Sequence, residues 1–165
     1  MTTLVFDSDA LIKLAKISII HKITKKFKCI ISEKVFKEVV IEGKKRGYKD
    51  AFIVENLVVQ GLVSVVRHVP DSRALTITRN LGEGEKATLS LFFNLNARFL
   101  VSDDERFLSR IRGHVRYLTS AAIIVRLFKL GFIAKSEALQ ALNNLKPFIN
   151  IRVFQRALNE VIKNH

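Results

Sequence analysis

The sequence predicts an α/β protein built on a parallel, doubly wound sheet with helices on both faces. Short apolar runs typical of buried strands alternate along the chain with longer segments of helical periodicity. No repeat or linker interrupts this alternation, so the 165 residues are expected to form one domain, residues 1–165. Alternating strands and helices favour parallel strands joined by crossover helices. In such sheets, ligands bind beyond the carboxyl ends of the strands.

Five strands are predicted from short apolar runs bounded by turn residues or by the start of a helix. The first precedes an acidic turn, and the third follows a helix that Gly61 is expected to stop. The expected strands are residues 4–6, 29–31, 62–66, 99–101 and 115–118.

Helices are predicted between these strands and after the last one. Ser32, Thr119 or Ser120, and Ser136 are expected to cap helices, because a hydroxyl can accept a backbone N–H of the first turn. A basic loop covers residues 43–47, and the polar stretch around Pro70 has no clear assignment. The expected helices are one or two within residues 10–27, then 33–41, 50–60, 83–95, 104–111, 120–130, one starting near 136, and 152–163.

The composition favours a nucleic-acid partner. The 28 Lys and Arg exceed the 15 Asp and Glu, giving a net charge of +13, which attracts polyanions. An acidic protein partner is the second reading. The longest apolar run is shorter than the ~18 residues of a membrane span, and the N-terminus lacks the basic start of a signal peptide. A cytoplasmic protein without membrane association is therefore expected.

Acidic residues follow two of the predicted strands. Asp7 and Asp9 come after the first strand, and Asp103 and Asp104 come after the fourth. Because the carboxyl ends of parallel strands meet at one edge of a sheet, both pairs are expected at the same place. Asp9 and Asp103 could equally serve as helix N-caps.

Three glutamates are expected near the same edge. Glu38 lies on the helix after the second strand, and Glu83 and Glu85 open the helix before the fourth. Taken alone, Glu38 could be a solvated helix residue, and Glu83 could simply interact with the helix dipole. Clustered carboxylates repel one another, and a hard cation such as Mg²⁺ or Mn²⁺ removes that cost. Such a site can hydrolyse phosphodiesters without a His or Cys nucleophile.

Other chemistries have weaker support. The four histidines, at positions 21, 68, 114 and 165, lack zinc-ligand spacing. A haloacid-dehalogenase-like phosphatase is an alternative, since Asp7-Ser8-Asp9 after a strand suits a nucleophile and acid pair. Against it, a Gly-Asp pair with a further Asp four residues later is missing near the fourth strand.

Five segments resemble successive motifs of PIN domains, and the resemblance is closest to a prokaryotic branch related to VapC toxins. In order, they are LVFDSDALIKLAKI, SEKVFKEVV, LGEGEKATLSLFF, FLVSDDERFLSRI and YLTSAAIIVRLFKLGFI. The resemblance implies a three-layer fold with a central parallel sheet of about five strands flanked by helices. It also implies a Mg²⁺- or Mn²⁺-dependent endoribonuclease, the toxin of a type II toxin–antitoxin pair, with a small antitoxin and a homodimer as expected partners. A non-catalytic PIN-fold binding module is a further alternative.

The resemblance also implies site residues. Asp7 matches the first acid of the family and Glu38 the second. Glu85 matches the third, with Glu83 as a close rival. Asp104 matches the fourth, because Phe107 follows it at the usual offset.

Further positions are expected to support this site. Asp103 is expected to share the metal, with Asp9 in a supporting role. Thr119 or Ser120 matches the hydroxyl position after the fifth strand. Candidates for contacts to the RNA backbone are Lys13, Lys44, Lys45, Arg46 and Arg106.

Overall fold

A five-stranded parallel sheet forms the centre of the computed structural model, which describes residues 1–164. The strand order is β3-β2-β1-β4-β5. The strands are β1 (Thr3–Phe6), β2 (Lys28–Ser32), β3 (Val63–Val66), β4 (Phe99–Val101) and β5 (Tyr117–Leu118). The predicted α/β class and parallel sheet are confirmed, although β5 is shorter than expected. His165 lies outside the described residues.

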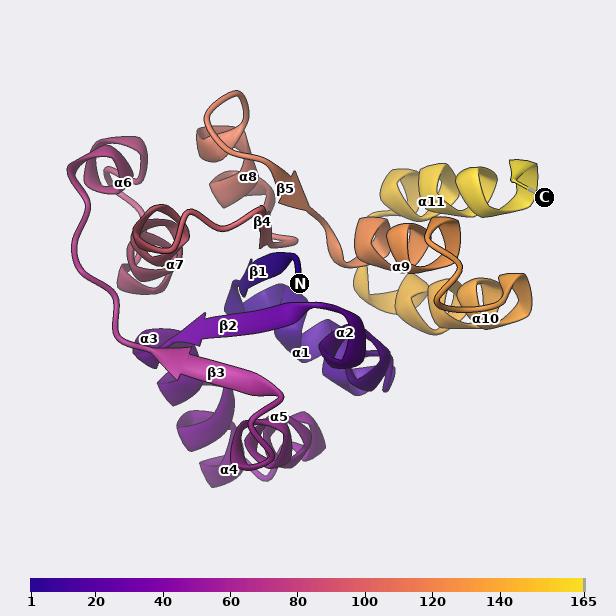
Figure 1. Cartoon of the computed structure of the whole chain (residues 1–165), viewed down its shortest axis with the longest axis horizontal. Coiled ribbons are helices and arrows are strands. Elements are labelled where there is room, and N and C mark those ends of the chain that lie inside the picture. Colours follow the sequence, from indigo (N-terminus) through magenta and orange to yellow (C-terminus); the bar gives the residue numbers. More distant parts are fainter. Residues whose placement is uncertain (165) are drawn as a thin grey trace.

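Helices cover both faces of the sheet (Figure 1). In chain order they are α1 (Ser8–Lys16), α2 (Ile20–Lys26), α3 (Glu33–Phe36), the π-helix η1 (Lys37–Glu42), α4 (Gly43–Lys45), α5 (Lys49–Val59), α6 (Ser72–Ile77), α7 (Glu83–Asn94), α8 (Glu105–Ile111), α9 (Ser120–Lys129), α10 (Lys135–Leu145), the 3₁₀ turn η2 (Lys146–Phe148) and α11 (Ile151–Lys163).

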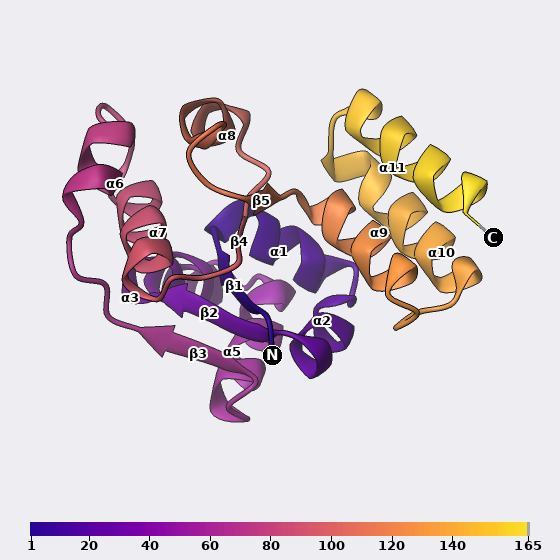
Figure 2. The same cartoon turned by 45° about the horizontal axis from the view of Figure 1, so that its top comes forward.

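Alternate residues of each strand enter two separate cores. Leu4 and Phe6 of β1 pack into a large core with α1, α2, α5 and α9 to α11. Val5 faces the opposite way, into a smaller core with α6, α7 and α8. Strands that are buried on both faces appear in the sequence as continuous apolar runs, which is why their positions could be predicted. Figures 1 and 2 show α9, α10 and α11 stacked together at one end of the molecule and α6 and α7 at the other.

Helix caps agree with the sequence at some positions and differ at others. Ser32 Oγ accepts from the Val35 N–H at 3.1 Å and Thr119 Oγ1 from the Ala122 N–H at 3.1 Å, as predicted. The predicted cap at Ser136 is wrong, because α10 begins at Lys135, and its N-cap is Ala134, two residues earlier. The Ala134 N–H there donates to Glu137 Oε1.

Two segments are more structured than the sequence suggested: the basic loop predicted at 43–47, of which Gly43–Lys45 form α4, and the stretch around Pro70. The region around Pro70 contains α6, which Asp71 caps by accepting from the N–H groups of Arg73 and Ala74. The segment 10–27 is divided into α1 and α2, and Ser18 between them has a positive φ of 62°. Within residues 1–164, no helix is long and apolar enough to cross a membrane.

Candidate active site

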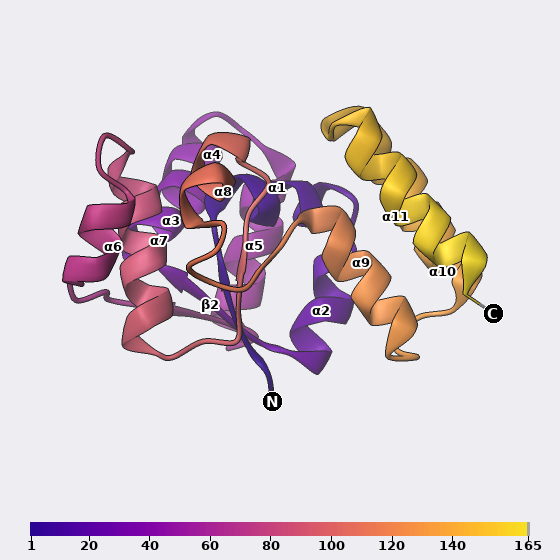
Figure 3. The same cartoon turned by 90° about the horizontal axis from the view of Figure 1, so that it is seen from above.

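The carboxyl ends of β1 and β4 lie side by side and define the candidate site. Phe6 pairs with Val101 in the parallel ladder, and the N–H of Asp7 donates to the carbonyl of Val101 at 2.8 Å. The residue after each strand is therefore fixed relative to its neighbour. This places Asp7 beside the turn of residues 102–104, as the sequence predicted. Figure 3, seen from above, shows the helices α1, α7, α8 and α9 around this part of the sheet.

Asp7 is buried and held by two hydrogen bonds. The Ser8 N–H donates to Oδ1 at 2.9 Å, and the Ser102 hydroxyl donates to Oδ2 at 2.8 Å. Only 6% of Asp7 is exposed. Burial raises the pKa of Asp7 to about 7, the two hydrogen bonds oppose this rise, and the nearby carboxylates of Glu85 and Asp104 add to it. Asp7 is thus an acid with two negative neighbours and little solvent.

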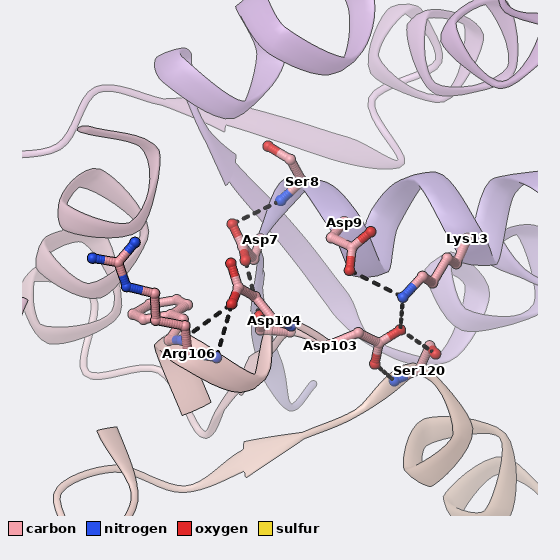
Figure 4. Close-up of polar contacts among 10 residues, drawn as sticks. Asp7, Ser8, Asp9, Lys13, Asp103, Asp104, Arg106 and Ser120 are labelled. Atoms are coloured by element: carbon pink, nitrogen blue, oxygen red, sulfur yellow. Dashed lines mark hydrogen bonds and ion pairs between the residues drawn. The ribbon is translucent and has the colours of Figure 1, made fainter. Parts of the chain in front are cut away.

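Asp104 lies beside Asp7 and begins α8. Its Oδ1 accepts from the N–H groups of Arg106 at 3.0 Å and Phe107 at 3.2 Å, so it caps the helix. The N–H of Asp104 donates to Ser102 Oγ at 3.2 Å. The Ser102 hydroxyl therefore connects the Asp7 carboxylate to the backbone N–H of Asp104. Figure 4 shows the carboxyl groups of Asp7 and Asp104 close together.

The glutamates approach this pair to different degrees. Glu85 is half-buried in the first turn of α7, and its charge acts on Asp7. Its Oε2 packs closely against Gly82, because a Cβ added to Gly82 would lie only 2.7 Å from this oxygen. Glu83 is exposed and paired with Lys86 at 3.4 Å. The arrangement favours Glu85 over Glu83 as the third acid of the site.

Glu38 reaches the site through Ser8. The Ser8 hydroxyl donates to Glu38 Oε2 at 2.7 Å, and the same oxygen lies 3.7 Å from the position of a Cβ added to Gly84. Glu38 belongs to the π-helix η1 and not to a regular α-helix. Single π-turns often occur at functional sites, because they change which side chain faces a cleft. Ser8 thus bridges the two expected acids, because its hydroxyl binds Glu38 and its N–H binds Asp7.

Asp103 belongs to a separate network. It accepts from the N–H of Ser120 at 2.7 Å and from its hydroxyl at 2.5 Å, and it pairs with the Lys13 ammonium at 3.3 Å. Lys13 also pairs with Asp9 at 3.0 Å, and Figure 4 shows both aspartates converging on it. Burial alone would lower the pKa of Lys13, but the two carboxylates raise it above its usual value. The N-cap readings of Asp9 and Asp103 are wrong, because Asp7 caps α1 and Asp104 caps α8.

We expect Lys13→Met to destabilise the fold by about 2 kcal/mol, between the cost of breaking an exposed pair and that of breaking a fully buried one. The reason is that Lys13 and Asp103 are only 15% and 6% exposed, and the carboxylate would keep only its bonds to Ser120. Urea unfolding measures the change. Lys45→Met is the matched control, because its pair with Glu42 is exposed. Equal losses in both variants would contradict a stabilising role for the buried pair.

The expected RNA-contacting cations are mostly engaged within the protein. Lys13 is paired as described, Lys44 contacts Glu55 at 2.7 Å, and Lys45 lies near Glu42 at 3.7 Å. The Arg106 guanidinium donates to the carbonyl of Asn80 at 3.0 Å. Contacts of these side chains to RNA remain predictions.

Sequence reasoning missed the two serines of the site. Ser8 and Ser102 are both buried and both bind a carboxylate directly. Their positions next to the acids, in the DSD and VSDD segments, were the available signal. A hydroxyl beside an acid is common in any sequence, so this signal has little weight without the fold.

The donor set fits a hard divalent cation in its chemistry. All the acids near Asp7 offer carboxylate oxygens, the ligands that Mg²⁺ and Mn²⁺ prefer. The repulsion that helps raise the pKa of Asp7 is what a cation would relieve. As the side chains stand, no three His, Cys, Asp or Glu residues in the described part of the chain lie close enough to hold a metal.

A family model, DUF3368, described as a PIN domain, matches residues 3–165. No curated protein and no solved structure matches the chain.

Proposed function

The chain belongs to the PIN-domain family, and on that premise we propose that it is a metal-dependent endoribonuclease that hydrolyses RNA phosphodiester bonds. PIN domains are generally nucleases. The observation that carries the proposal is Asp7, a buried acid at the carboxyl end of β1 with Glu85 and Asp104 near enough to raise its pKa. Burial is the main cause of this raised pKa, and acids with strongly shifted pKa values are concentrated at functional sites.

We assign the proposed metal ligands as Asp7, Glu38, Glu85 and Asp104. When bound, Mg²⁺ or Mn²⁺ would supply an activated water and stabilise charge on the phosphoryl oxygens. Ser102 and the Ser8 N–H hold the Asp7 carboxylate in place, and the first turn of α8 holds that of Asp104. Ser8 holds the Glu38 carboxylate in the same way.

The network around Lys13 supports this site from one side. Asp103 was expected as a ligand, but its bonds to Lys13 and Ser120 favour a supporting role that it shares with Asp9. The network ties the turn after β4 to α1 and α9. Thr119 caps α9, which fixes the helix that carries Ser120. The Ser120 hydroxyl after β5 thus supports the turn that carries Asp103.

The finer assignment is that of a VapC-like toxin, cytoplasmic and dimeric, restrained by a small antitoxin. It rests on the resemblance of the five motifs to VapC toxins, and on the +13 charge, which suits both RNA and an acidic partner. Expression of the chain alone in a bacterial host tests it. Growth arrest by the wild type but not by Asp7→Asn is expected, and harmless wild-type expression would contradict the toxin role.

Incubation of the pure protein with mixed RNAs, in Mn²⁺ and in chelator, tests the nuclease proposal. We expect internal cleavage only with the metal. Release of phosphate through a covalent aspartyl-phosphate would instead indicate the phosphatase alternative. RNA binding without cleavage in either condition would indicate the non-catalytic PIN-fold module.

We expect RNA affinity to fall steeply between about 50 and 200 mM salt, because basic residues that bind phosphates release counterions. The 28 Lys and Arg of the chain supply these contacts. Fluorescence anisotropy of a labelled RNA, in chelator to prevent cleavage, gives the slope. A flat response would mean that the positive charge serves a partner other than the phosphate backbone.

A further inference from the structure

A groove of about 540 Å³ begins beside the candidate active site and runs away from it. It lies between α8, β5, α9 and α11. One end is lined by Glu105, which directly follows Asp104 in the chain, and by Thr119, which directly precedes Ser120. The other end is lined by Lys129 and Glu160. Along α9 its lining runs from Ala121 to Leu130, which spans about 14 Å of helix.

The floor of the groove is apolar and follows the edge of the sheet. β5 is the last strand in the sheet order, so one side of it has no neighbouring strand. Leu118 of this strand, Leu108 of α8 and Val125 of α9 line the groove. Tyr117 also lines it; its hydroxyl accepts from Arg112 Nε at 3.1 Å, and the Arg112 guanidinium carbon lies over its ring, 6.0 Å from the ring centre. A planar apolar group can therefore pack against this floor.

The rim of the groove has more positive than negative charge. Four cations line it, and two of them are neutralised locally: Arg112 by Glu105 at 3.3 Å, and Lys129 by Glu160 at 2.7 Å. Within residues 1–164, the other two, Arg126 and Arg156, have no acidic partner.

Arg126 has an unmet hydrogen-bonding requirement. Its guanidinium carbon lies 4.7 Å from the centre of the Phe99 ring, which holds the side chain in place. Its Nε is buried and has no acceptor among the described residues. Buried N–H groups without a partner are rare in folded proteins, and each calls for an explanation. Because this Nε is buried, only the terminal nitrogens of Arg126, whose side chain lines the groove, can meet a ligand there.

We propose that this groove binds a stretch of single-stranded RNA next to the cleavage site. Arg126 and Arg156 contact phosphate or base oxygens, while bases pack on the apolar floor and on Tyr117, as bases do on aromatic platforms elsewhere. The lining by Glu105 and Thr119, which adjoin Asp104 and Ser120 in the chain, places one end of the groove near the candidate site, and the +13 net charge favours RNA over an acidic peptide. The inference rests on the proposed function for its substrate class.

The test is RNA binding by the full chain in chelator, with a labelled single-stranded RNA of mixed sequence. We expect Arg126→Gln and Arg156→Gln each to weaken binding about tenfold and to reduce the salt slope by about one. Lys25→Gln is the matched control, because it removes the same charge from the exposed face of α2 and is expected to bind as the wild type does. Arg156 is exposed on α11, so its variant keeps the test valid even if Arg126→Gln unfolds.

Cross-linking of a 4-thiouridine-substituted RNA gives a second readout. We expect cross-links within residues 117–130. Wild-type affinity in both arginine variants, or cross-links only elsewhere, would overturn the proposal and leave the groove to a protein partner. Metal-dependent cleavage by the wild type together with such a result would refute the groove alone. Groove-dependent binding without any cleavage would refute the nuclease assignment alone.

Discussion

Asp7→Asn is expected to lower Mn²⁺-dependent RNA cleavage by at least about a hundredfold. The amide removes the anionic ligand, and the stabilisation that a metal gives to developing charge is worth several kcal/mol. The substitution keeps the shape of the side chain. Its Oδ1 can still accept from the Ser8 N–H, and its amide can donate to the Ser102 hydroxyl.

Single-turnover cleavage of a labelled RNA measures this effect. Asp71→Asn is the matched control, because Asp71 also caps a helix but belongs to α6 and does not affect the pKa of Asp7. It is expected to cleave at the wild-type rate. Full activity of Asp7→Asn in a clean preparation would remove Asp7 from the catalytic site.

The same substitution is expected to stabilise the metal-free protein at pH 8 by about 1 kcal/mol or more, since one pKa unit corresponds to about that energy. The pKa of Asp7 is raised from 3.8 to about 7 by burial and by its acidic neighbours. Below the unfolded pKa, the carboxyl is protonated in both states and carries no penalty. As pH rises towards 7, the unfolded state loses its proton first, so the wild type becomes less stable. The penalty is complete above about pH 7.

Thermal melts in chelator at pH 4 and pH 8 test this. At pH 8, Asp7→Asn is expected to melt about 2–4 °C above the wild type, with a smaller difference at pH 4. Asp71→Asn should change stability in the opposite direction, because hydrogen bonds from Arg73 lower the pKa of Asp71. Excess Mn²⁺ should favour the wild type again, because only its full ligand set gains the binding energy. A lower melting temperature of Asp7→Asn at pH 8 in chelator would show that Asp7 is an ordinary helix cap.

The sheet could be predicted from the sequence because its signal is local. Buried parallel strands appear as short apolar runs, and the residue after each run falls at the carboxyl edge wherever the strands pair. This was enough to place Asp7 and Asp104 together. Ser32 and Thr119 as caps, and Gly61 as a helix stop with positive φ, follow from equally local rules.

Features that depend on packing between distant elements could not be predicted. The π-helix that carries Glu38 precedes Gly43, where a Cβ would lie only 2.8 Å from the Cβ of Ala51 on α5. No local pattern specifies that contact. The different roles of Asp103 and Asp104 depend likewise on Lys13 and Ser120, which come from separate helices. Two adjacent aspartates look alike until those helices are in place.

Mn²⁺ binding, measured by calorimetry or by electron paramagnetic resonance, tests most directly whether acids from four segments of the chain share one divalent cation at the carboxyl edge of the sheet. We expect the wild type to bind Mn²⁺ at this site, Asp7→Asn and Asp104→Asn to bind it at least about tenfold more weakly, and Asp71→Asn to bind it as the wild type does. Equal Mn²⁺ affinity in all four proteins would contradict the shared site.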